Sequence, residues 1–280
     1  MATVAEALEL RSELPEARLI VLGPASDQVA QARDGRLELV HAAGPIPDGI
    51  AVHLKLDTGM GRWGVSELPA PSRHVVGVMT HLATADTDLG FARAQIERFR
   101  AATEPLSHLT RHVANSAAAL RLPESRFDAG RCGIALYGLS PFGTDPVDDG
   151  LEPVLSWSSE IATSELLHTG ESTGYGRRFV ADRDTWIGIV PVGYGDGFRR
   201  DLTGTEVIVG GERRRVIGAV SMDAFAVELD GDVPSGTSVA IVGEGLLLEE
   251  HARVAGTLNY ELACGIKSSP TRSRRAMMES

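Results

Sequence analysis

The sequence is poor in several residue types, and each shortage excludes a class of protein. It contains only two cysteines, Cys132 and Cys264, and neither has a second cysteine or a histidine at metal-ligand spacing, so we expect no disulfide framework and no metal site. No apolar run approaches the ~20 residues of a membrane-spanning helix. The acidic N-terminal stretch lacks the basic and apolar regions of a secretion signal. We therefore expect a soluble, cytoplasmic protein.

Basic charge is scarce, and lysine in particular. The formal net charge of −11 argues against a nucleic-acid or anionic-membrane partner, because both need a basic patch. Lys55 and Lys267 are the only lysines, and every other basic side chain is arginine or histidine. Chemistry that needs a lysine amine therefore has two candidate positions in these 280 residues.

What is present is the composition of an ordinary globule, 43% hydrophobic and 23% charged, long enough for one large domain or two modest ones. The first half alternates strand-like and helix-like segments, which is typical of a parallel sheet or barrel. We predict helices over residues 5–14, 26–33, 91–104 and 116–122. We predict strands over residues 18–22, 37–41, 52–56, 74–79, 109–113 and 134–137.

After Pro141 the pattern changes to strands with little helix. Predicted strands cover residues 154–166, 185–189, 206–209, 216–219, 224–229 and 238–242, and a helix covers 246–255. Gly210-Gly211 lies between two of these segments and predicts a two-residue hairpin turn. We place the domain boundary near residues 141–152, with one domain over 1–145 and the other over 150–280.

One connection is unusually short. A parallel crossover needs a dozen or more residues, yet residues 42–50 offer only nine, including Pro45 and Pro47. No helix fits there. Either the two flanking strands are not neighbours in the usual way, or one barrel unit is shortened.

Four segments of the first half end strands with residues that can carry chemistry. The first, VHLKLDTGMGRWGV (52–65), brings Arg62 into a glycine-rich loop, and its Asp57 can satisfy loop amides. The second, MTHLATAD (79–86), places His81 at a strand end, where a lone histidine is more often structural than catalytic.

The third segment, HVANSA (112–117), leads from a strand into a helix, where a hydroxyl and free amides can bind phosphate. An equally good interpretation is that Asn115 or Ser116 only caps the helix. In the fourth, RCGIALYGL (131–139), Gly133 and Ile134 could offer amides to the same phosphate. Tyr137, in an apolar segment, is expected in the core, and so are Trp157, Trp186 and Phe225.

Taken in this order, the four segments resemble the fold type III alanine racemases. The second half agrees, with GYGR (174–177), PVGYGDG (191–197), AVSMD (219–223) and LNYELACGI (258–266). The resemblance implies an N-terminal partial (β/α)8, TIM-like barrel followed by a C-terminal β-rich domain. It also implies interconversion of L- and D-alanine for peptidoglycan precursors, with pyridoxal 5'-phosphate (PLP) as cofactor, and a homodimer with shared active sites.

The resemblance assigns a role to each site residue. Tyr175 matches the catalytic tyrosine, which serves the active site of the neighbouring subunit, and His81 would link it to Arg131. Arg131 would contact the pyridine nitrogen of the cofactor. Phosphate ligands would be Ser116, Gly133, Ile134 and Tyr260. Substrate contacts would come from Arg62, the Met222 amide and Tyr194.

The family's lysine block, a motif like KANAYGHG that holds PLP through the lysine amine, has no counterpart in the sequence. Lys55 matches a different position, one that some relatives carbamylate; a lysine whose charge meets a nearby carboxylate is an interpretation at least as good. Three hypotheses follow. The chain is a truncated racemase, inactive by itself; or a lysine-less homologue that binds PLP or an amino acid, or pairs with a full-length racemase; or a fragment that does not fold.

Overall fold

The computed structural model describes residues 1–267 and residue 276. The last part of the predicted second domain, residues 268–275 and 277–280, lies outside the described residues. The chain forms two compact units, Met1–Gly133 and Ile134–Ser280. Each is described separately.

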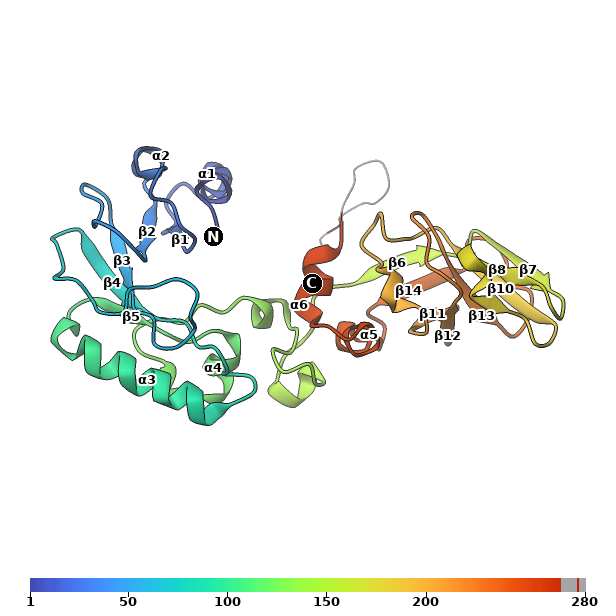
Figure 1. Ribbon diagram of the computed structural model, residues 1–280. Coiled ribbons are helices and arrows are strands. Elements are labelled where there is room, and N and C mark those ends of the chain that lie inside the picture. Colours follow the sequence, from blue (N-terminus) through green and yellow to red (C-terminus); the bar gives the residue numbers. More distant parts are fainter. Residues whose placement is uncertain (268–275, 277–280) are drawn as a thin grey trace. The chain divides into compact units, whose positions relative to one another are not determined.

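The N-terminal unit contains a five-stranded, entirely parallel sheet (Figure 1). Its strands lie side by side in the order in which they follow along the chain, as in a half-barrel. They are β1 (Ile20–Val21), β2 (Glu38–His41), β3 (Val52–Lys55), β4 (Val75–Met79) and β5 (Thr110–His112). The predicted partial barrel is confirmed, and with it each strand predicted before residue 114.

The helices of this unit begin where the sequence provides caps. Thr3 and Glu6 form a reciprocal capping box at the start of α1 (Val4–Glu13), and Asp88 caps α3 (Leu89–Thr103). In α3 the buried residues recur at helical spacing, which fixes the face turned to the core. Two shorter helices, α2 (Val29–Asp34) and α4 (Ser116–Arg121), complete the set of predicted helices.

The short connection between β2 and β3 is a shortened barrel unit. The two strands pair directly in parallel, Leu39 with Val52, so the first of the two alternatives is wrong. The connecting loop packs Ile50 into the core. Arg33 of α2 holds the loop by donating to the carbonyl oxygens of Asp48 (2.6 Å) and Gly49 (3.1 Å). These contacts fix the loop against the N-terminal unit in the absence of a crossover helix between β2 and β3.

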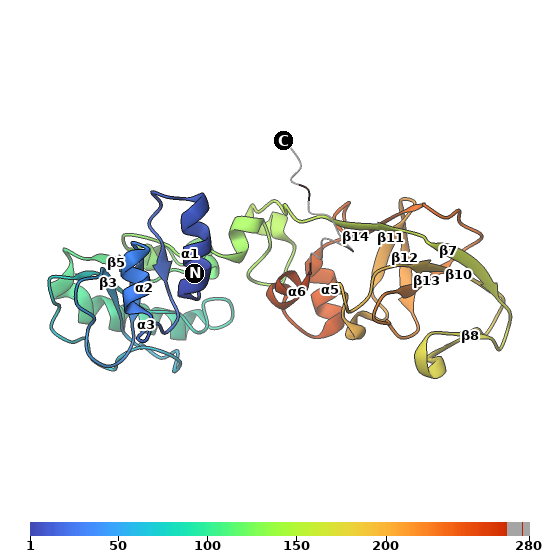
Figure 2. The same ribbon diagram turned by 90° about the horizontal axis from the view of Figure 1, so that it is seen from above.

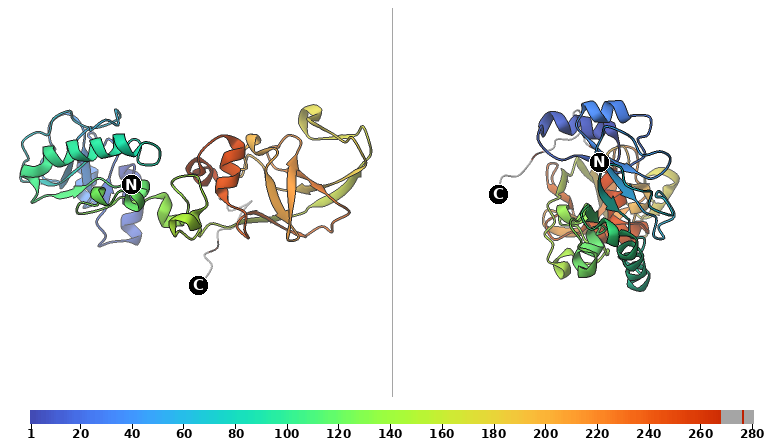
Figure 3. Two further views of the ribbon diagram at one scale, coloured as in Figure 1. Left: turned by 90° about the horizontal axis from the view of Figure 1, so that it is seen from below. Right: turned by 90° about the vertical axis from the view of Figure 1, so that its left-hand side faces the viewer.

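The C-terminal unit is built on an antiparallel sheet of seven strands in the order β6-β14-β11-β12-β13-β10-β7 (Figure 2). The strands are β6 (Trp157–Glu160), β7 (Thr163–Leu167), β10 (Thr185–Val190), β11 (Glu206–Val209), β12 (Glu212–Ile217), β13 (Phe225–Leu229) and β14 (Ser238–Val242). Val209 pairs with Glu212, so the predicted two-residue turn at Gly210-Gly211 is confirmed. Helices α5 (Leu248–Ala255) and α6 (Asn259–Gly265) pack together, in red in the left view of Figure 3.

Two predicted strands between residues 134 and 166 are wrong in detail, and one hairpin was not predicted. Residues 134–137 form a 3₁₀ turn, Ile134–Tyr137, which leaves Tyr137 62% exposed. The predicted strand 154–166 is two strands, because the chain turns at Ile161 and Ala162 to join opposite ends of the sheet order. A small hairpin of β8 (Ser172–Thr173) and β9 (Phe179–Val180) was not predicted.

The core of the C-terminal unit is centred on aromatic rings. Phe198 stacks on Phe225 with ring centroids 4.3 Å apart, and Trp157 meets Phe198 edge-on at 6.2 Å. Trp186 packs against the same core. The predicted packing roles of Trp157, Trp186 and Phe225 are confirmed.

Candidate active site

The carboxyl ends of the parallel strands bring the predicted site residues of the N-terminal unit to one edge. Lys55 at the end of β3 is level with Met79 of β4, and Met79 is level with His112 of β5. Neighbours in register lie on the same face of a sheet. Lys55 and His112 therefore share one face, and both are buried. Active sites of barrel folds are built at this end of the strands.

Arg131 is the centre of the site. One terminal nitrogen, Nη1, donates to the His112 carbonyl oxygen (2.8 Å) and lies 3.1 Å from His112 Nδ1. The other, Nη2, donates to the carbonyl oxygens of Thr80 (2.8 Å) and Val113 (3.3 Å). Among the described residues, no carboxylate lies within 4 Å of this guanidinium. Burial lowers the pKa of Arg131 to about 10, so the group stays protonated at neutral pH.

His81 is joined to Arg131. Its Nδ1 lies 3.3 Å from Arg131 Nη2, and because a guanidinium only donates, Nδ1 accepts. Burial first, and then the positive charge of Arg131, lower the pKa of His81 to about 4. His81 is therefore neutral at pH 7, with its hydrogen on Nε2.

Lys55 and Arg62 both lie near the ring of Trp63. The Lys55 ammonium lies 5.3 Å from the ring centroid and the Arg62 guanidinium 5.0 Å from it, both within cation–π range. Burial first, then Arg62 and Arg131, lower the pKa of Lys55 to about 8. The negative charge of Asp57 opposes this lowering of the Lys55 pKa. Lys55 therefore does meet a nearby carboxylate, though none of the described residues places one within 4 Å of its ammonium, and carbamylation stays a prediction.

Asp57, the acidic residue nearest to Lys55 in the sequence, is hydrogen-bonded to backbone amides. Its carboxylate accepts from the backbone amides of Gly59 (2.9 Å), Met60 (2.9 Å) and Gly61 (3.1 Å). These bonds shape the glycine-rich loop that carries Arg62, as predicted for Asp57.

Asn115 and Ser116 make different hydrogen bonds: the predicted helix cap is confirmed for Asn115, and the phosphate role of Ser116 stays a prediction. The Asn115 side chain caps α4 by accepting from Ala118 N (3.0 Å). The Ser116 hydroxyl instead accepts from the Gly133 amide (3.0 Å), which brings two predicted phosphate ligands together. Ile134 follows Gly133 directly and is buried.

In the C-terminal unit, close backbone contacts bring the predicted motifs together. Tyr194 N donates to the Ser221 carbonyl (3.1 Å), and Gly195 N donates to the Met222 carbonyl (2.9 Å). A Cβ on Gly193 would lie 2.4 Å from the Met222 carbonyl carbon, so only glycine permits this approach. Among the residues that the structure covers, nothing accepts from the Met222 amide.

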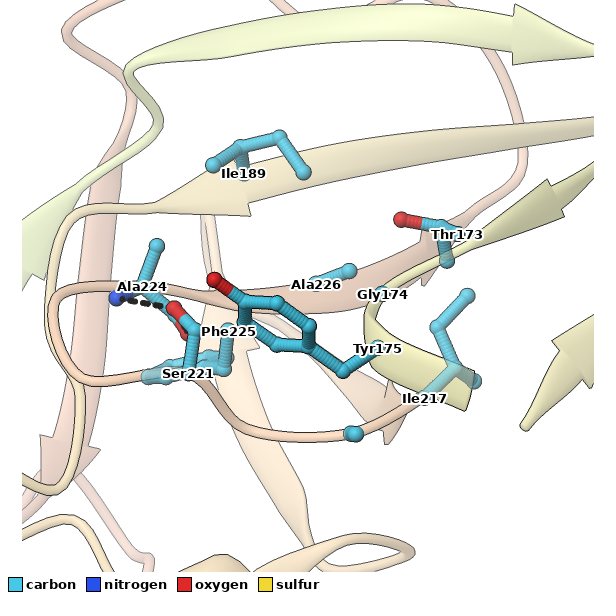
Figure 4. A pocket seen from close by; sticks show the side chains of 10 residues that line it. Thr173, Gly174, Tyr175, Ile189, Ile217, Ser221, Ala224, Phe225 and Ala226 are labelled. Carbon is cyan, nitrogen blue, oxygen red and sulfur yellow. Dashed lines mark hydrogen bonds between the residues drawn. The ribbon is translucent and has the colours of Figure 1, made fainter. Parts of the chain in front are cut away.

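Tyr175 lies beside the same loop. It lines an open pocket of about 350 Å³ with Ser221, Ala224 and Phe225 (Figure 4), and the Ser221 hydroxyl fixes the turn by accepting from Ala224 N (3.0 Å). The Tyr175 side chain is 73% exposed. Tyr194, Met222 and Tyr260, the last on α6, are also large exposed residues of this unit.

The sequence did not identify His53 and His112 as site residues. His53 Nδ1 lies 2.8 Å from His112 Nε2, and His53 Nε2 lies 2.7 Å from the Glu38 carboxylate. One signal was available: His53 and Lys55 are two residues apart on a strand, so they lie on the same face. No cluster of three metal-ligating side chains and no membrane-spanning helix occurs within the described ranges.

Comparisons with known proteins agree with this geometry. Residues 1–141 match the family model "Alanine racemase, N-terminal domain", and residues 154–274 match "Alanine racemase, C-terminal domain". Alanine racemase 1 of Bacillus subtilis is 39% identical, over 96% of this chain and 77% of that protein. The alanine racemase of Geobacillus stearothermophilus is 35% identical, over 95% of this chain and 76% of that protein.

Two solved structures illustrate the similarity in fold. The biosynthetic alanine racemase of Pseudomonas aeruginosa has a TM-score of 0.87 and 34% identity, over 95% of this chain and 82% of that one. The alanine racemase of Streptomyces coelicolor A3(2) has a TM-score of 0.85 and 32% identity, over 95% and 81%. This chain therefore belongs to the alanine racemase family, whose members depend on pyridoxal phosphate.

Proposed function

We propose that the function of this chain is that of an alanine racemase, in which residues 1–145 bind PLP and residues 150–280 supply the catalytic tyrosine. The observation that carries this proposal is Arg131, a protonated guanidinium without a carboxylate at the carboxyl end of the strands. The Nε–H group of Arg131 has no acceptor among the described residues. It can therefore donate a hydrogen bond to a ligand whose ring nitrogen is unprotonated. The product, D-alanine, would serve peptidoglycan synthesis in the cytoplasm.

The residues on the N-terminal unit fit the cofactor. Arg131 would face the pyridine nitrogen and, by donating to it, keep it unprotonated. Ser116 and Gly133, already within hydrogen-bonding distance of each other, would hold the phosphate with Ile134 and Tyr260. PLP, when bound, supplies the electron sink that makes the Cα proton of an amino acid removable.

Tyr175 would move that proton, in the site of a partner subunit. A phenol with its usual pKa near ~10 is a poor base at neutral pH unless a positive group stabilises the phenolate. His81 is suited to this task because its Nδ1 accepts from Arg131. The opposite nitrogen, Nε2, then carries a hydrogen that can be donated to the phenolate oxygen.

The remaining residues would hold the substrate. Arg62, exposed on the loop that Asp57 fixes, and the Met222 amide would bind the alanine carboxylate. Tyr194 and Tyr260 would narrow the entrance, which favours a small amino acid.

A homodimer agrees with the exposed apolar side chains of the C-terminal unit. Leu136 is 72% exposed, Val147 and Tyr175 are each 73% exposed, and Tyr137 is 62% exposed. A contiguous exposed apolar patch marks an interface, and Leu136 and Tyr137 are adjacent in the sequence.

We further propose that the 280-residue chain does not racemise alanine by itself. Lys267 has no place in the motifs of the family. Lys55 matches a position other than the cofactor lysine, and the unneutralised charges of Arg62 and Arg131 around it suit a carbamylated amine, which is negative. A second candidate function follows from the same shortage of lysine: a non-catalytic homologue that binds PLP or an amino acid, or pairs with a complete racemase.

The test uses the chain alone and an extended chain, preceded by a segment that carries the lysine motif of the family. D-Alanine formed from L-alanine is measured with D-amino-acid oxidase. We expect no activity from the chain alone, activity from the extended chain, and a loss of at least 100-fold in extended Tyr175→Phe, the range of a general acid–base group. An extended chain that folds and binds PLP without racemising would contradict the racemase proposal and favour the non-catalytic homologue.

A further inference from the structure

A series of buried hydrogen bonds links Arg131 to Glu38 of β2 along one face of the sheet. Arg131 Nη1 lies 3.1 Å from His112 Nδ1, His112 Nε2 lies 2.8 Å from His53 Nδ1, and His53 Nε2 lies 2.7 Å from Glu38. Both imidazoles are buried, His53 completely. Glu38 is held from the surface side by Arg18, whose Nε and Nη2 donate to its two oxygens at 2.7 and 2.8 Å.

The series of hydrogen bonds passes over β4, and Gly77 of β4 leaves the space for it. His53 is on β3 and His112 on β5, with β4 between them. Gly77 of β4 is the register partner of His53. A Cβ at Gly77 would lie 2.2 Å from His53 Nδ1 and 2.9 Å from the Thr110 carbonyl oxygen. Only a residue without a side chain leaves room for the two rings to meet.

The direction of each bond follows from the guanidinium. Arg131 can only donate, so His112 Nδ1 accepts and the His112 hydrogen is on Nε2. That hydrogen is donated to His53 Nδ1, so the His53 hydrogen is on Nε2 and is donated to Glu38. Burial, and then the charge of Arg131, lower the pKa of His112 to about 3, which agrees with a neutral ring. Each ring nitrogen of the two imidazoles is thus used once, either as a donor or as an acceptor.

Arg131 needs such an arrangement because a buried charge without a counter-charge is costly. Its direct partners are carbonyl oxygens and imidazoles. Glu38 is the one anion that the hydrogen-bonded series reaches. Two neutral rings, both donating toward Glu38, turn the negative ends of their dipoles toward Arg131.

We propose that Glu38 and His53 are positioning residues that act on Arg131 through His112. They fix the rotation of the guanidinium and provide its remote counter-charge. The inference rests on the proposed function only for what Arg131 binds. The hydrogen-bond series itself belongs to the 280-residue chain and can be tested there without cofactor or activity.

The experiment is nitrogen-15 NMR of the histidines and arginines of the 280-residue chain at pH 7. We expect His112 and His53 each to carry a hydrogen on Nε2 alone, and Arg131 to show slow rotation about its Cζ–Nη bonds. In Glu38→Gln and His53→Leu, rotation should become about tenfold faster, the factor expected for one hydrogen bond of ordinary strength. His53→Gln, which keeps an acceptor and a donor, should restore part of the effect.

Glu97→Gln is the matched control, because within residues 1–267 Glu97 pairs with the exposed Arg100 alone and should leave the Arg131 signals unchanged. If His53→Leu does not fold, Glu38→Gln decides, since it keeps the size of the side chain. A His112 hydrogen on Nδ1, or Arg131 rotation that is the same in wild type and Glu38→Gln, would overturn the positioning role. Neither result would bear on the racemase proposal, which the extended chain tests.

Discussion

Gly77→Ala should destabilise the N-terminal unit far more than a single methyl group usually does. The new Cβ would lie 2.2 Å from His53 Nδ1 and 2.6 Å from His53 Cε1, well inside contact distance, and His53 is completely buried. Overpacking of this kind costs about 1–3 kcal/mol. Separating His53 from His112 leaves a buried N–H without an acceptor, which costs about 1–3 kcal/mol more. The sum is about 2–6 kcal/mol in the free energy of unfolding.

Urea denaturation followed by circular dichroism measures this difference. The control is Gly130→Ala in the same unit, where a Cβ would meet nothing closer than 4.0 Å; its stability should stay within about 0.5 kcal/mol of wild type. A Gly77→Ala chain as stable as the control would refute the reasoning, because it would mean that the sheet opens easily at the crossing of the two histidines.

Three further predictions concern single side chains. The pKa of Lys55 is lowered to about 8 from 10.5, so its charge opposes folding below pH 8 and the penalty disappears as the pH rises to 10.5. Lys55→Met should therefore be more stable than wild type at pH 7, with the gap closing toward pH 10.5; an unchanged gap in thermal unfolding would contradict this. The pKa of Glu38 is lowered to about 2 from 4.5, chiefly by its hydrogen bond to His53 and then by Arg18. Its contribution to stability is thus present above pH 4.5 and lost as the pH falls toward 2, so Glu38→Gln should show a flatter melting profile over that range, whereas parallel profiles would contradict it. Tyr175→Phe should change the unfolding free energy by less than about 0.5 kcal/mol, because its ring is 73% exposed, and a larger loss in urea denaturation would indicate a structural role.

Local signals in the sequence predicted most of the fold. Strand and helix periodicity gave the parallel sheet of the first unit, and Gly210-Gly211 gave a hairpin turn. The prediction of a strand over residues 134–137 was wrong because an apolar run of four fits a strand or a turn of helix equally well. The break at Ile161 and Ala162 was not predicted, because it depends on which distant strands β6 and β7 join.

The site was harder to predict where it depends on contacts across strands. Arg131 and His81 were found from their motifs, and the structure brings them within hydrogen-bonding distance. The bond between His53 and His112 joins positions 59 residues apart and exists only because Gly77 is small. No local pattern reports such a meeting, since each histidine alone resembles an ordinary buried residue.

The central claim is that Tyr175 of one subunit completes the site around Arg131 of another. Its most direct test mixes two proteins that we propose to be inactive when alone: the 280-residue chain, which has Tyr175, and the extended chain carrying Tyr175→Phe. The account predicts that racemase activity appears on mixing, in proportion to the mixed dimer detected by native mass spectrometry. Mixed dimers that form and remain inactive, beside an active extended chain with Tyr175, would contradict it.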